Sequence, residues 1–269
     1  MSPTPQKILN TPPAGVSETI HSGVRFITFN SPETKNALTV ELASEYQKAI
    51  DKIAQDAEAR VVVLGANGNC FSAGGDFDFL QARHEDTPAG NRVAMRQFYD
   101  LYLSIRTLRV PIVAAVSGHA IGAGLALALA ADLRVVANDA KLGLTFVGLG
   151  LHPGMGATYF TERAVGSQRA QWALLTGATF SGSEGAEWGM FLEGLAQNAV
   201  TDCAVTLANQ IAMQSPNAVS ATLATLRDKT HAPLESALWQ EASGQAKCYG
   251  HHEFETGLKA IRDKKQPQF

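Results

Sequence analysis

The sequence is poor in charge, in cysteine and in long apolar runs. Its 22 basic and 25 acidic residues give a net charge of −3, so it lacks the basic surface of a nucleic-acid-binding protein. Its three cysteines are far apart and show neither metal-ligand spacing nor a disulfide pattern, which predicts a reducing compartment and a cytoplasmic location. The longest apolar run, residues 122–131, is too short to cross a bilayer, so we expect no membrane partner.

The length and composition suit one large domain, or one domain with a smaller appendage. Hydrophobic residues make up 45% of the 269 residues, enough for a sizeable core, and the low charged fraction of 17% hints at burial in an oligomer. The first 15 residues are rich in proline and threonine and lack the apolar core of a signal peptide. We expect the first dozen residues to form a loose arm.

Strand and helix patterns alternate through the first part of the chain. Apolar residues at helical spacing after Thr39, a plausible N-cap, predict a helix over 39–56. The other expected elements are strands at 23–30, 60–65, 110–116, 133–137 and 141–145, and helices at 91–108 and 122–131. This order predicts an α/β fold whose sheets stack like a coil.

After Gly166 the pattern becomes helical. The expected helices cover 167–176, 183–190, 201–214, 217–230, 234–249 and 251–264. Pro216 and Pro233 are placed at the starts of two of them, where a missing N–H costs least. We therefore expect residues 1–200 to form the substrate-binding core. Residues 201–269 should form a helical region that packs on this core or on a neighbouring subunit.

Two glycine-rich segments are the most informative feature. CFSAGGD at 70–76 follows one expected strand, SGHAIGAGL at 117–125 follows another, and each precedes a stretch that can form a helix. Such junctions expose N–H groups without intrahelical partners, and the helix dipole adds partial positive charge. Two of them in one domain could aim two N–H groups at a single carbonyl oxygen, which is an oxyanion hole.

Together with other motifs, these segments resemble the crotonase family, also called the enoyl-CoA hydratase/isomerase superfamily. The matching motifs are NAL at 36–38, FSAGGD at 71–76, PIVAAV at 111–116, GHAIGAG at 118–124, AD at 131–132, GLHPGMG at 150–156, AVG at 164–166 and GLKA at 257–260. The resemblance implies a spiral of ββα turns with a helical C-terminal part. It also implies an acyl-CoA substrate, no separate cofactor, and a homotrimer or hexamer.

Under this resemblance, the two oxyanion N–H groups belong to Gly75 and Ala123. Backbone donation tolerates an alanine at the second position, because the donor is not the side chain. Lys35 is the best candidate for contacting the CoA phosphates. The remaining residues implied to bind the substrate are Ser72, Ala73, Gly74, Asp76, Gly122, Gly124, Phe146 and Gly154.

The carboxylates of a hydratase are missing from their expected places. The two family positions that carry glutamate fall on Ala126 and Phe146, and the position of the isomerase aspartate falls on Gly154. None of these residues can transfer a proton, so hydration by paired glutamates is disfavoured. Asp132 ends a buried helix, which favours a capping or turn role.

Histidines and two nearby aspartates remain as candidates. His152 is the better general acid or base, with turn capping as its alternative, whereas His119 in the second loop is more readily structural. His251 and His252 are interpreted as a solvated helix start, although the last helix can line a neighbour's pocket in the family. Asp76 and Asp78 lack a third ligand, so helix capping is favoured over a metal site.

The expected function is that of an acyl-CoA lyase or isomerase that holds an enolate in the backbone hole. The double histidine and PGMGAT at 153–158 resemble a polyketide-associated branch that decarboxylates glutaconyl thioesters, but no lysine lies between Arg60 and Arg134 to match that branch. Loss of CO₂ would create the enolate directly. The alternatives are 3-enoyl isomerisation and a non-catalytic acyl-CoA-binding homologue. RNA binding, known in the family, is disfavoured by the acidic balance.

Overall fold

The computed structural model describes residues 15–21, as backbone only, and residues 23–269. The loose arm expected for the first dozen residues lies outside the described residues. The larger sheet has six strands in the order β1-β2-β3-β5-β7-β10, with only β1 and β2 antiparallel. Its strands are Gly15–His21 (β1), Val24–Asn30 (β2), Val61–Ala66 (β3), Ile112–Val116 (β5), Leu133–Ala137 (β7) and Glu193–Leu195 (β10).

A smaller sheet in the order β4-β6-β8-β9 lies beside the first. Its strands are Cys70–Ser72 (β4), His119–Ile121 (β6), Lys141–Gly143 (β8) and Thr179–Ser181 (β9). The chain passes from the large sheet to the small one three times, from β3 to β4, from β5 to β6 and from β7 to β8. Each passage leads into helical structure, so the predicted coil of ββα turns is confirmed.

Helices cover the sheets, and their ends follow local signals. The Thr39 hydroxyl accepts a hydrogen bond from the Leu42 N–H (3.0 Å), which confirms the predicted N-cap. The α-helices are Val40–Ala54 (α1), Phe77–His84 (α2), Pro88–Leu103 (α3), Ala123–Leu129 (α4), Ala157–Thr176 (α5), Gly182–Glu187 (α6), Val200–Ala212 (α7), Pro216–Tyr249 (α8) and His252–Arg262 (α9). The 3-10 turns are Pro32–Thr34 (η1), Ser104–Thr107 (η2), Val147–Leu149 (η3) and Gln197–Ala199 (η4). Along the described residues, no helix has both the length and the apolarity that a bilayer crossing needs.

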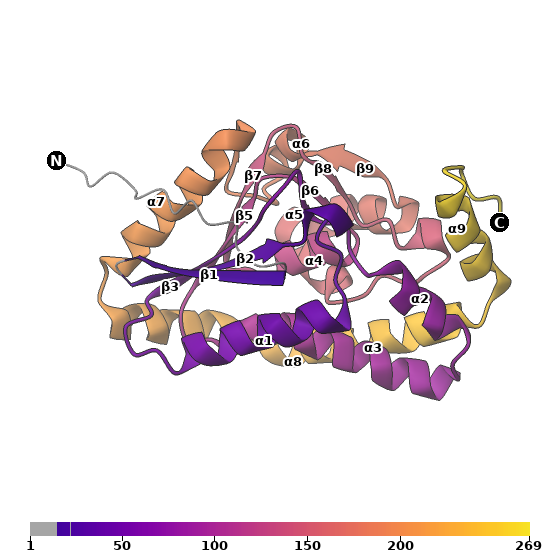
Figure 1. Ribbon diagram of the computed structural model, residues 1–269, viewed down its shortest axis with the longest axis horizontal. Helices are drawn as coiled ribbons and strands as arrows, with labels where there is room; N and C mark the ends of the chain where they lie inside the picture. The colour runs from indigo at the N-terminus through magenta and orange to yellow at the C-terminus, as the bar shows by residue number, and fades with distance from the viewer. Residues whose placement is uncertain (1–14, 22) are drawn as a thin grey trace.

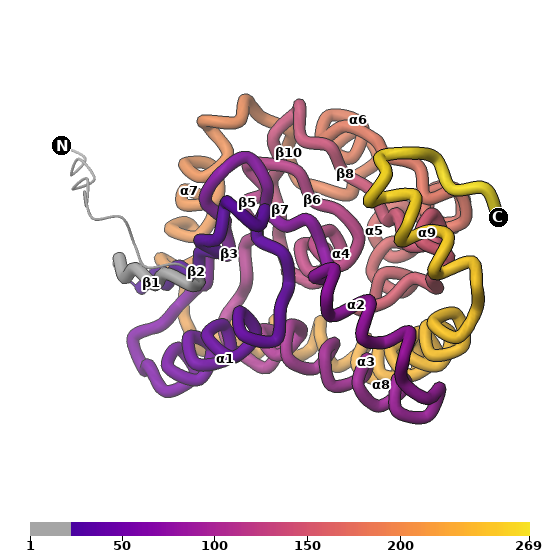
Figure 2. The backbone as a smooth tube through the Cα atoms, turned by 45° about the vertical axis from the view of Figure 1, so that its right-hand side comes forward, coloured from indigo at the N-terminus to yellow at the C-terminus, as the bar shows by residue number. Residues whose placement is uncertain are grey.

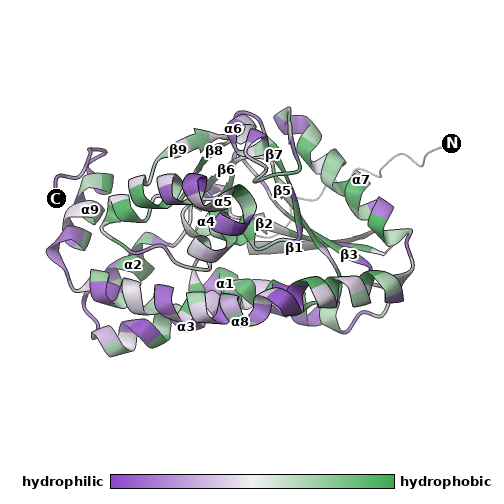
Figure 3. Ribbon diagram, turned by 180° about the vertical axis from the view of Figure 1, so that it is seen from behind, coloured by the Kyte–Doolittle hydropathy of each residue, from purple (hydrophilic) through white to green (hydrophobic). Residues whose placement is uncertain are grey.

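The C-terminal part corrects one prediction. The two helices expected at 217–230 and 234–249 form one helix, α8, and Pro233 lies inside it rather than at a start. The missing N–H of Pro233 does not end the helix, because α8 packs along α3 and buries Leu234 and Leu238 (Figure 1). Polar and apolar residues mix along its outer side (Figure 3).

The last helix folds back over the body of the molecule. After α8, α9 packs on η3, and the C-terminus lies on the side of α9 that faces away from the strands (Figure 2). A Cβ atom at Gly257 would lie 2.6 Å from the Leu149 carbonyl oxygen, so the helix approaches this turn closely. The tail thereby covers loops of its own chain, and α7 covers strands β3, β5 and β7 of the large sheet.

Candidate active site

The loop after β4 is held by the segment that precedes α1. The Leu38 N–H donates to the Gly74 carbonyl (2.8 Å), and the Asp76 N–H donates to the Leu38 carbonyl (3.2 Å). On the other side, the Ser72 hydroxyl accepts from the Gly74 N–H (3.1 Å). The Gly75 N–H between these bonds has no acceptor within the described residues. It is therefore free to donate to a ligand.

The loop after β6 presents a second free donor. The Gly122 N–H donates to the Gly143 carbonyl (2.8 Å), and Gly122 turns the chain with a φ of 56°. Ala123 is the first residue of α4, where an N–H has no intrahelical partner. In the described part of the chain, no acceptor pairs with it. The dipole of α4 adds partial positive charge at this N–H.

Glycine allows the two loops to touch. A Cβ atom at Gly74 would lie 2.7 Å from the Ile121 carbonyl oxygen and 3.4 Å from the Ala123 nitrogen, and Gly74 has a φ of 93°. A Cβ atom at Gly124 would lie 2.5 Å from the Ser72 carbonyl oxygen. The loops carrying the two free N–H groups are therefore in van der Waals contact, which only residues without a side chain permit at these points.

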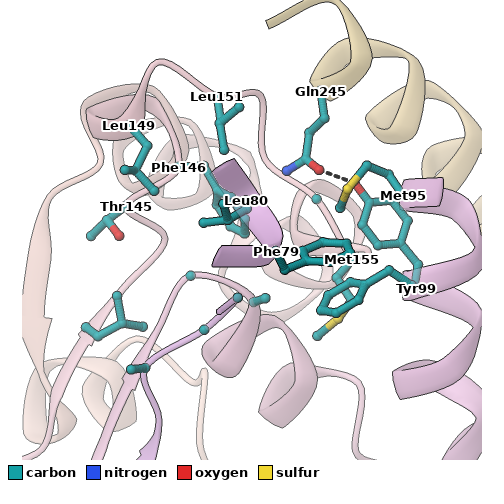
Figure 4. A pocket seen from close by; sticks show the side chains of 18 of the residues that line it. Phe79, Leu80, Met95, Tyr99, Thr145, Phe146, Leu149, Leu151, Met155 and Gln245 are labelled. Carbon is teal, nitrogen blue, oxygen red and sulfur yellow. Dashed lines mark hydrogen bonds between the residues drawn. The ribbon is translucent and has the colours of Figure 1, made fainter. Parts of the chain in front are cut away.

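Both loops open into one small, largely apolar cavity (Figure 4). Gly75 and Ala123 lie on its wall, and the Phe146 ring lies near Gly122. Its other apolar side chains come from α2, α3, β6 and the turns before α5, namely Phe79, Leu80, Met95, Phe98, Ile121, Leu149, Leu151 and Met155. Across the described residues, no Asp, Glu, His, Lys or Arg side chain lines this cavity.

The polar side chains on the wall are all uncharged. The Tyr99 hydroxyl donates to Gln245 Oε1 (2.8 Å), and Gln245 Nε2 donates to the His152 carbonyl (2.9 Å). The Tyr249 hydroxyl donates to the Met95 sulfur (3.4 Å). Burial raises the pKa of the Tyr99 phenol well above its ordinary value of 10, with the Glu241 carboxylate as a second cause. Tyr99 is therefore a neutral hydrogen-bonding group and not a base.

A buried carboxyl lies behind the wall. Glu241, one helical turn before Gln245, is 1% exposed and accepts hydrogen bonds from the Gly156 N–H (2.6 Å) and the Thr158 N–H (2.9 Å). The Thr158 hydroxyl donates to it as well (2.5 Å). Burial raises the pKa of Glu241 to about 7, against these hydrogen bonds, which lower it. Glu241 thus ties α8 to the start of α5, beside the turn that lines the cavity.

The structure brings most of the predicted loop residues together. Those that line the cavity are Ala73, Gly74, Gly75, Gly122, Ala123, Phe146 and Gly154. Ser72, Asp76 and Gly124 do not line the cavity but support the loops. Ser72 accepts from the Gly74 N–H, and Gly124 packs on Ser72. Asp76 caps α2 by accepting from the N–H groups of Asp78 and Phe79. The capping role predicted for Asp76 is confirmed. Lys35 is exposed, and its carbonyl accepts from the Ala73 N–H (3.0 Å), so it borders the first loop.

The two candidate histidines lie outside the cavity lining. The His119 Nδ1 accepts from the Lys141 N–H (2.9 Å), which links the first residues of β6 and β8, the two central strands of the small sheet. The His152 Nδ1 donates to the Pro153 carbonyl (2.7 Å), and its ring packs on Gly244 of α8. Both therefore hold local structure, and their predicted acid–base roles receive no support from position.

The remaining predicted positions are structural. Asp132 accepts from the Ile112 N–H (2.9 Å) and pairs with Arg227 (2.6 Å), in agreement with its expected turn role. Ala126 is buried inside α4. His251 occupies the exposed N-cap position of α9 without a side-chain capping bond, and the exposed His252 is the first residue of the helix, which confirms the solvated helix start.

Sequence reasoning missed the wall contributed by α3 and α8. Met95 and Tyr99 are four residues apart on α3, and Gln245 and Tyr249 are four residues apart on α8. This i, i+4 spacing places each pair on one helix face. A polar stripe of Glu241, Gln245 and Tyr249 on a helix face was the available signal, but nothing in the sequence indicated that this face meets the glycine loops.

Comparisons of the sequence and of the structure with known proteins point to the same family. A family model described as enoyl-CoA hydratase/isomerase matches residues 19–269. A probable enoyl-CoA hydratase of Mycobacterium tuberculosis is 37% identical over 246 residues, 89% of this chain and 94% of that protein. A crystal structure of an enoyl-CoA hydratase from Mycobacterium avium subsp. paratuberculosis matches with a TM-score of 0.83 at 27% identity, covering 96% of this chain and 99% of the other. A structure from a dehydratase/decarboxylase enzyme couple involved in polyketide β-branching matches with a TM-score of 0.80 at 26% identity, covering 91% and 98%.

Proposed function

Because this chain belongs to the enoyl-CoA hydratase/isomerase family, we propose that it decarboxylates an acyl-CoA thioester through an enolate held by the N–H groups of Gly75 and Ala123. The main support for this proposal is the cavity. Two free backbone N–H groups lie on its wall, and its described lining residues include no carboxylate and no imidazole. The substrate is a thioester with a carboxylate placed so that loss of CO₂ leaves an enolate. Coenzyme A enters as part of that substrate.

The two N–H groups supply the electrostatic part of catalysis. The thioester oxygen gains negative charge as the enolate forms, and donors fixed in an apolar cavity stabilise that charge more strongly than water does. Removing one donor of this kind raises a barrier by roughly 2.7–4 kcal/mol. Because the donors are main-chain groups held by Leu38, Ser72 and Gly143, they need no rearrangement during the reaction.

The missing acids favour decarboxylation among the reactions that share an enolate. Hydration needs a base to activate water, and double-bond isomerisation needs a base to remove a proton from the acyl chain. The positions that could supply one, Ala126, Phe146 and Gly154, carry no titratable group. Decarboxylation needs no base, because the electron pair of the breaking C–C bond forms the enolate. An apolar cavity also desolvates the leaving carboxylate.

A substrate panel tests this function. The purified protein is incubated with methylmalonyl-CoA, glutaconyl-CoA, crotonyl-CoA and a 3-enoyl-CoA, and the products are separated and weighed by mass spectrometry. We expect loss of CO₂ from a carboxylated thioester, with little hydration and little isomerisation. Hydration of crotonyl-CoA at the rate of a paired-glutamate hydratase contradicts the proposal, and so does tight binding of every thioester without turnover.

The proposal extends to the oligomeric state and the cellular location of the protein. We infer a homotrimer, or a hexamer built from two, from the family resemblance, and the exposed apolar side chains of Trp172, Leu175 and Leu192 are a surface that a subunit contact would cover. The three cysteines are free, as in proteins of a reducing compartment such as the cytoplasm. Light scattering of the purified protein measures the assembly, and a monomeric mass refutes it.

A further inference from the structure

Gly154 leaves room for a buried polar pair on the cavity wall. A Cβ atom at Gly154 would lie 2.4 Å from the Tyr99 hydroxyl and 2.7 Å from Gln245 Nε2. A side chain at this position and the pair of Tyr99 and Gln245 therefore exclude each other. The space that the resemblance assigned to an isomerase aspartate is occupied by a phenol from α3 and an amide from α8 (Figure 4).

This pair keeps hydrogen-bonding capacity toward the cavity. Tyr99 is 1% exposed and Gln245 is 2% exposed, so neither meets bulk water. The Gln245 amide has two N–H groups, of which one donates to the His152 carbonyl. The Tyr99 hydroxyl donates to Gln245 Oε1 and can rotate toward a stronger acceptor. One amide N–H and one hydroxyl are therefore available to a ligand oxygen.

No cation accompanies these donors on the wall formed by described residues. Arg83 and Arg96, on α2 and α3, do not line the cavity, and each pairs with carboxylates. Arg83 pairs with Asp86, and Arg96 pairs with Glu235 and Asp100. A carboxylate at Tyr99 and Gln245 would thus be oriented by neutral donors only. Neutral donors stabilise a carboxylate less than a guanidinium or ammonium does, so they compensate less of its desolvation.

We propose that Tyr99 and Gln245 bind the carboxylate that the substrate loses, and so select carboxylated acyl groups while leaving that carboxylate poorly stabilised. This inference rests on the proposed function. In the step, the C–C bond to the carboxylate breaks, and CO₂ departs. The electron pair forms the enolate double bond, and the negative charge moves to the thioester oxygen at Gly75 and Ala123. A proton from solvent then adds to the carbon, and the acyl-CoA leaves with an uncharged acyl group.

The test compares each carboxylated thioester with its own product. The pairs are methylmalonyl-CoA with propionyl-CoA, and glutaconyl-CoA with crotonyl-CoA, so that the position of the carboxylate is also determined. The variants are Tyr99→Phe, Gln245→Met and Gly154→Ala, the last of which pushes a methyl group into the pair without removing its polar atoms. The control is Tyr102→Phe, a buried phenol on α3 that donates to the Thr39 carbonyl and does not line the cavity.

We expect Tyr99→Phe and Gln245→Met to lower kcat/KM for the carboxylated thioester by about 10- to 100-fold, the effect of one hydrogen bond to a charged group. The Kd of the product, whose acyl group carries no charge, should change less than about threefold, and Tyr102→Phe should behave as the wild type. The inference is overturned if a variant lowers kcat/KM for the carboxylated thioester and raises the Kd of its product by the same factor, or if it changes neither. In both cases the proposed function still holds, provided that the wild type releases CO₂. If the wild type releases no CO₂, the proposed function fails and the inference fails with it.

Discussion

The buried carboxyl of Glu241 should make the stability of this protein fall as the pH rises. Its pKa is about 7 in the folded protein, against an ordinary value of 4.5, because burial penalises the charged form. Between these two values the folded state holds a proton that the unfolded chain has released. Stability is therefore greatest below the unfolded pKa and is lost as the pH rises through the folded pKa.

The size of the effect follows from the shift. The pKa of Glu241 is higher by about 2.5 in the folded protein than in the unfolded chain, which is equivalent to about 3 kcal/mol of folding free energy. About 2–3 kcal/mol of this stability is lost between pH 5 and pH 8. Glu241→Gln cannot ionise, so it removes this slope. Its amide keeps only one oxygen, so it loses the acceptor either for the Gly156 N–H or for the Thr158 N–H and hydroxyl, which costs stability at every pH.

Urea unfolding of both proteins at pH 5, 6, 7 and 8, at one protein concentration, measures the slope. All other titrating groups are shared, so the free-energy difference between wild type and Glu241→Gln isolates Glu241. The exposed Glu187→Gln serves as the control and should differ little from the wild type at any pH. A difference between wild type and Glu241→Gln that stays constant from pH 5 to pH 8 refutes the assignment of a raised pKa.

Three further substitutions test the site and its supports. Ala123→Pro removes one donor at the first position of α4, where proline is tolerated, and should lower kcat/KM by about 100- to 1000-fold, whereas Ala123→Gly keeps the N–H and should retain activity. Gly74→Ala should lower the free energy of unfolding by about 1–3 kcal/mol and kcat by at least about tenfold, because its φ is 93° and a Cβ would meet the Ile121 carbonyl. Gly65→Ala, with no neighbour near its Cβ, is the matched control in urea unfolding. Asp132→Asn should cost about 2 kcal/mol of stability by weakening the pair with Arg227, with kcat/KM unchanged; a loss of activity at full stability would place Asp132 in the reaction instead.

Local signals in the sequence predicted much of the fold. The strand at 133–137 and the cap at Thr39 follow from β-branched content and from a hydroxyl before a periodic apolar segment. The helix expected at 167–176 is the second half of α5, where Gly166 breaks the helical dihedrals with a φ of 74°. The prediction that a new helix starts at Pro233 was wrong, because the packing of α8 on α3 outweighed the cost of the missing N–H.

The sequence predicted only those parts of the candidate site that are formed by residues close together in the chain. The free donors at Gly75 and Ala123 belong to glycine loops that a sequence reveals directly. Tyr99 and Gln245 are 146 residues apart, and their hydrogen bond depends on how α8 lies along α3. His119 and His152 are titratable residues within the motifs, but neither ring lines the cavity, and each is held by a hydrogen bond to the backbone, at Lys141 and Pro153 respectively.

A crystal structure with a ketone analogue of an acyl-CoA, in which carbon replaces the thioester sulfur, tests the central claim most directly. We predict a carbonyl oxygen within about 3 Å of both the Gly75 and the Ala123 nitrogens. The acyl chain should lie against Phe146, with no carboxylate side chain within hydrogen-bonding distance of it. A carbonyl that contacts neither nitrogen, or an acidic side chain facing the acyl carbons, contradicts the account.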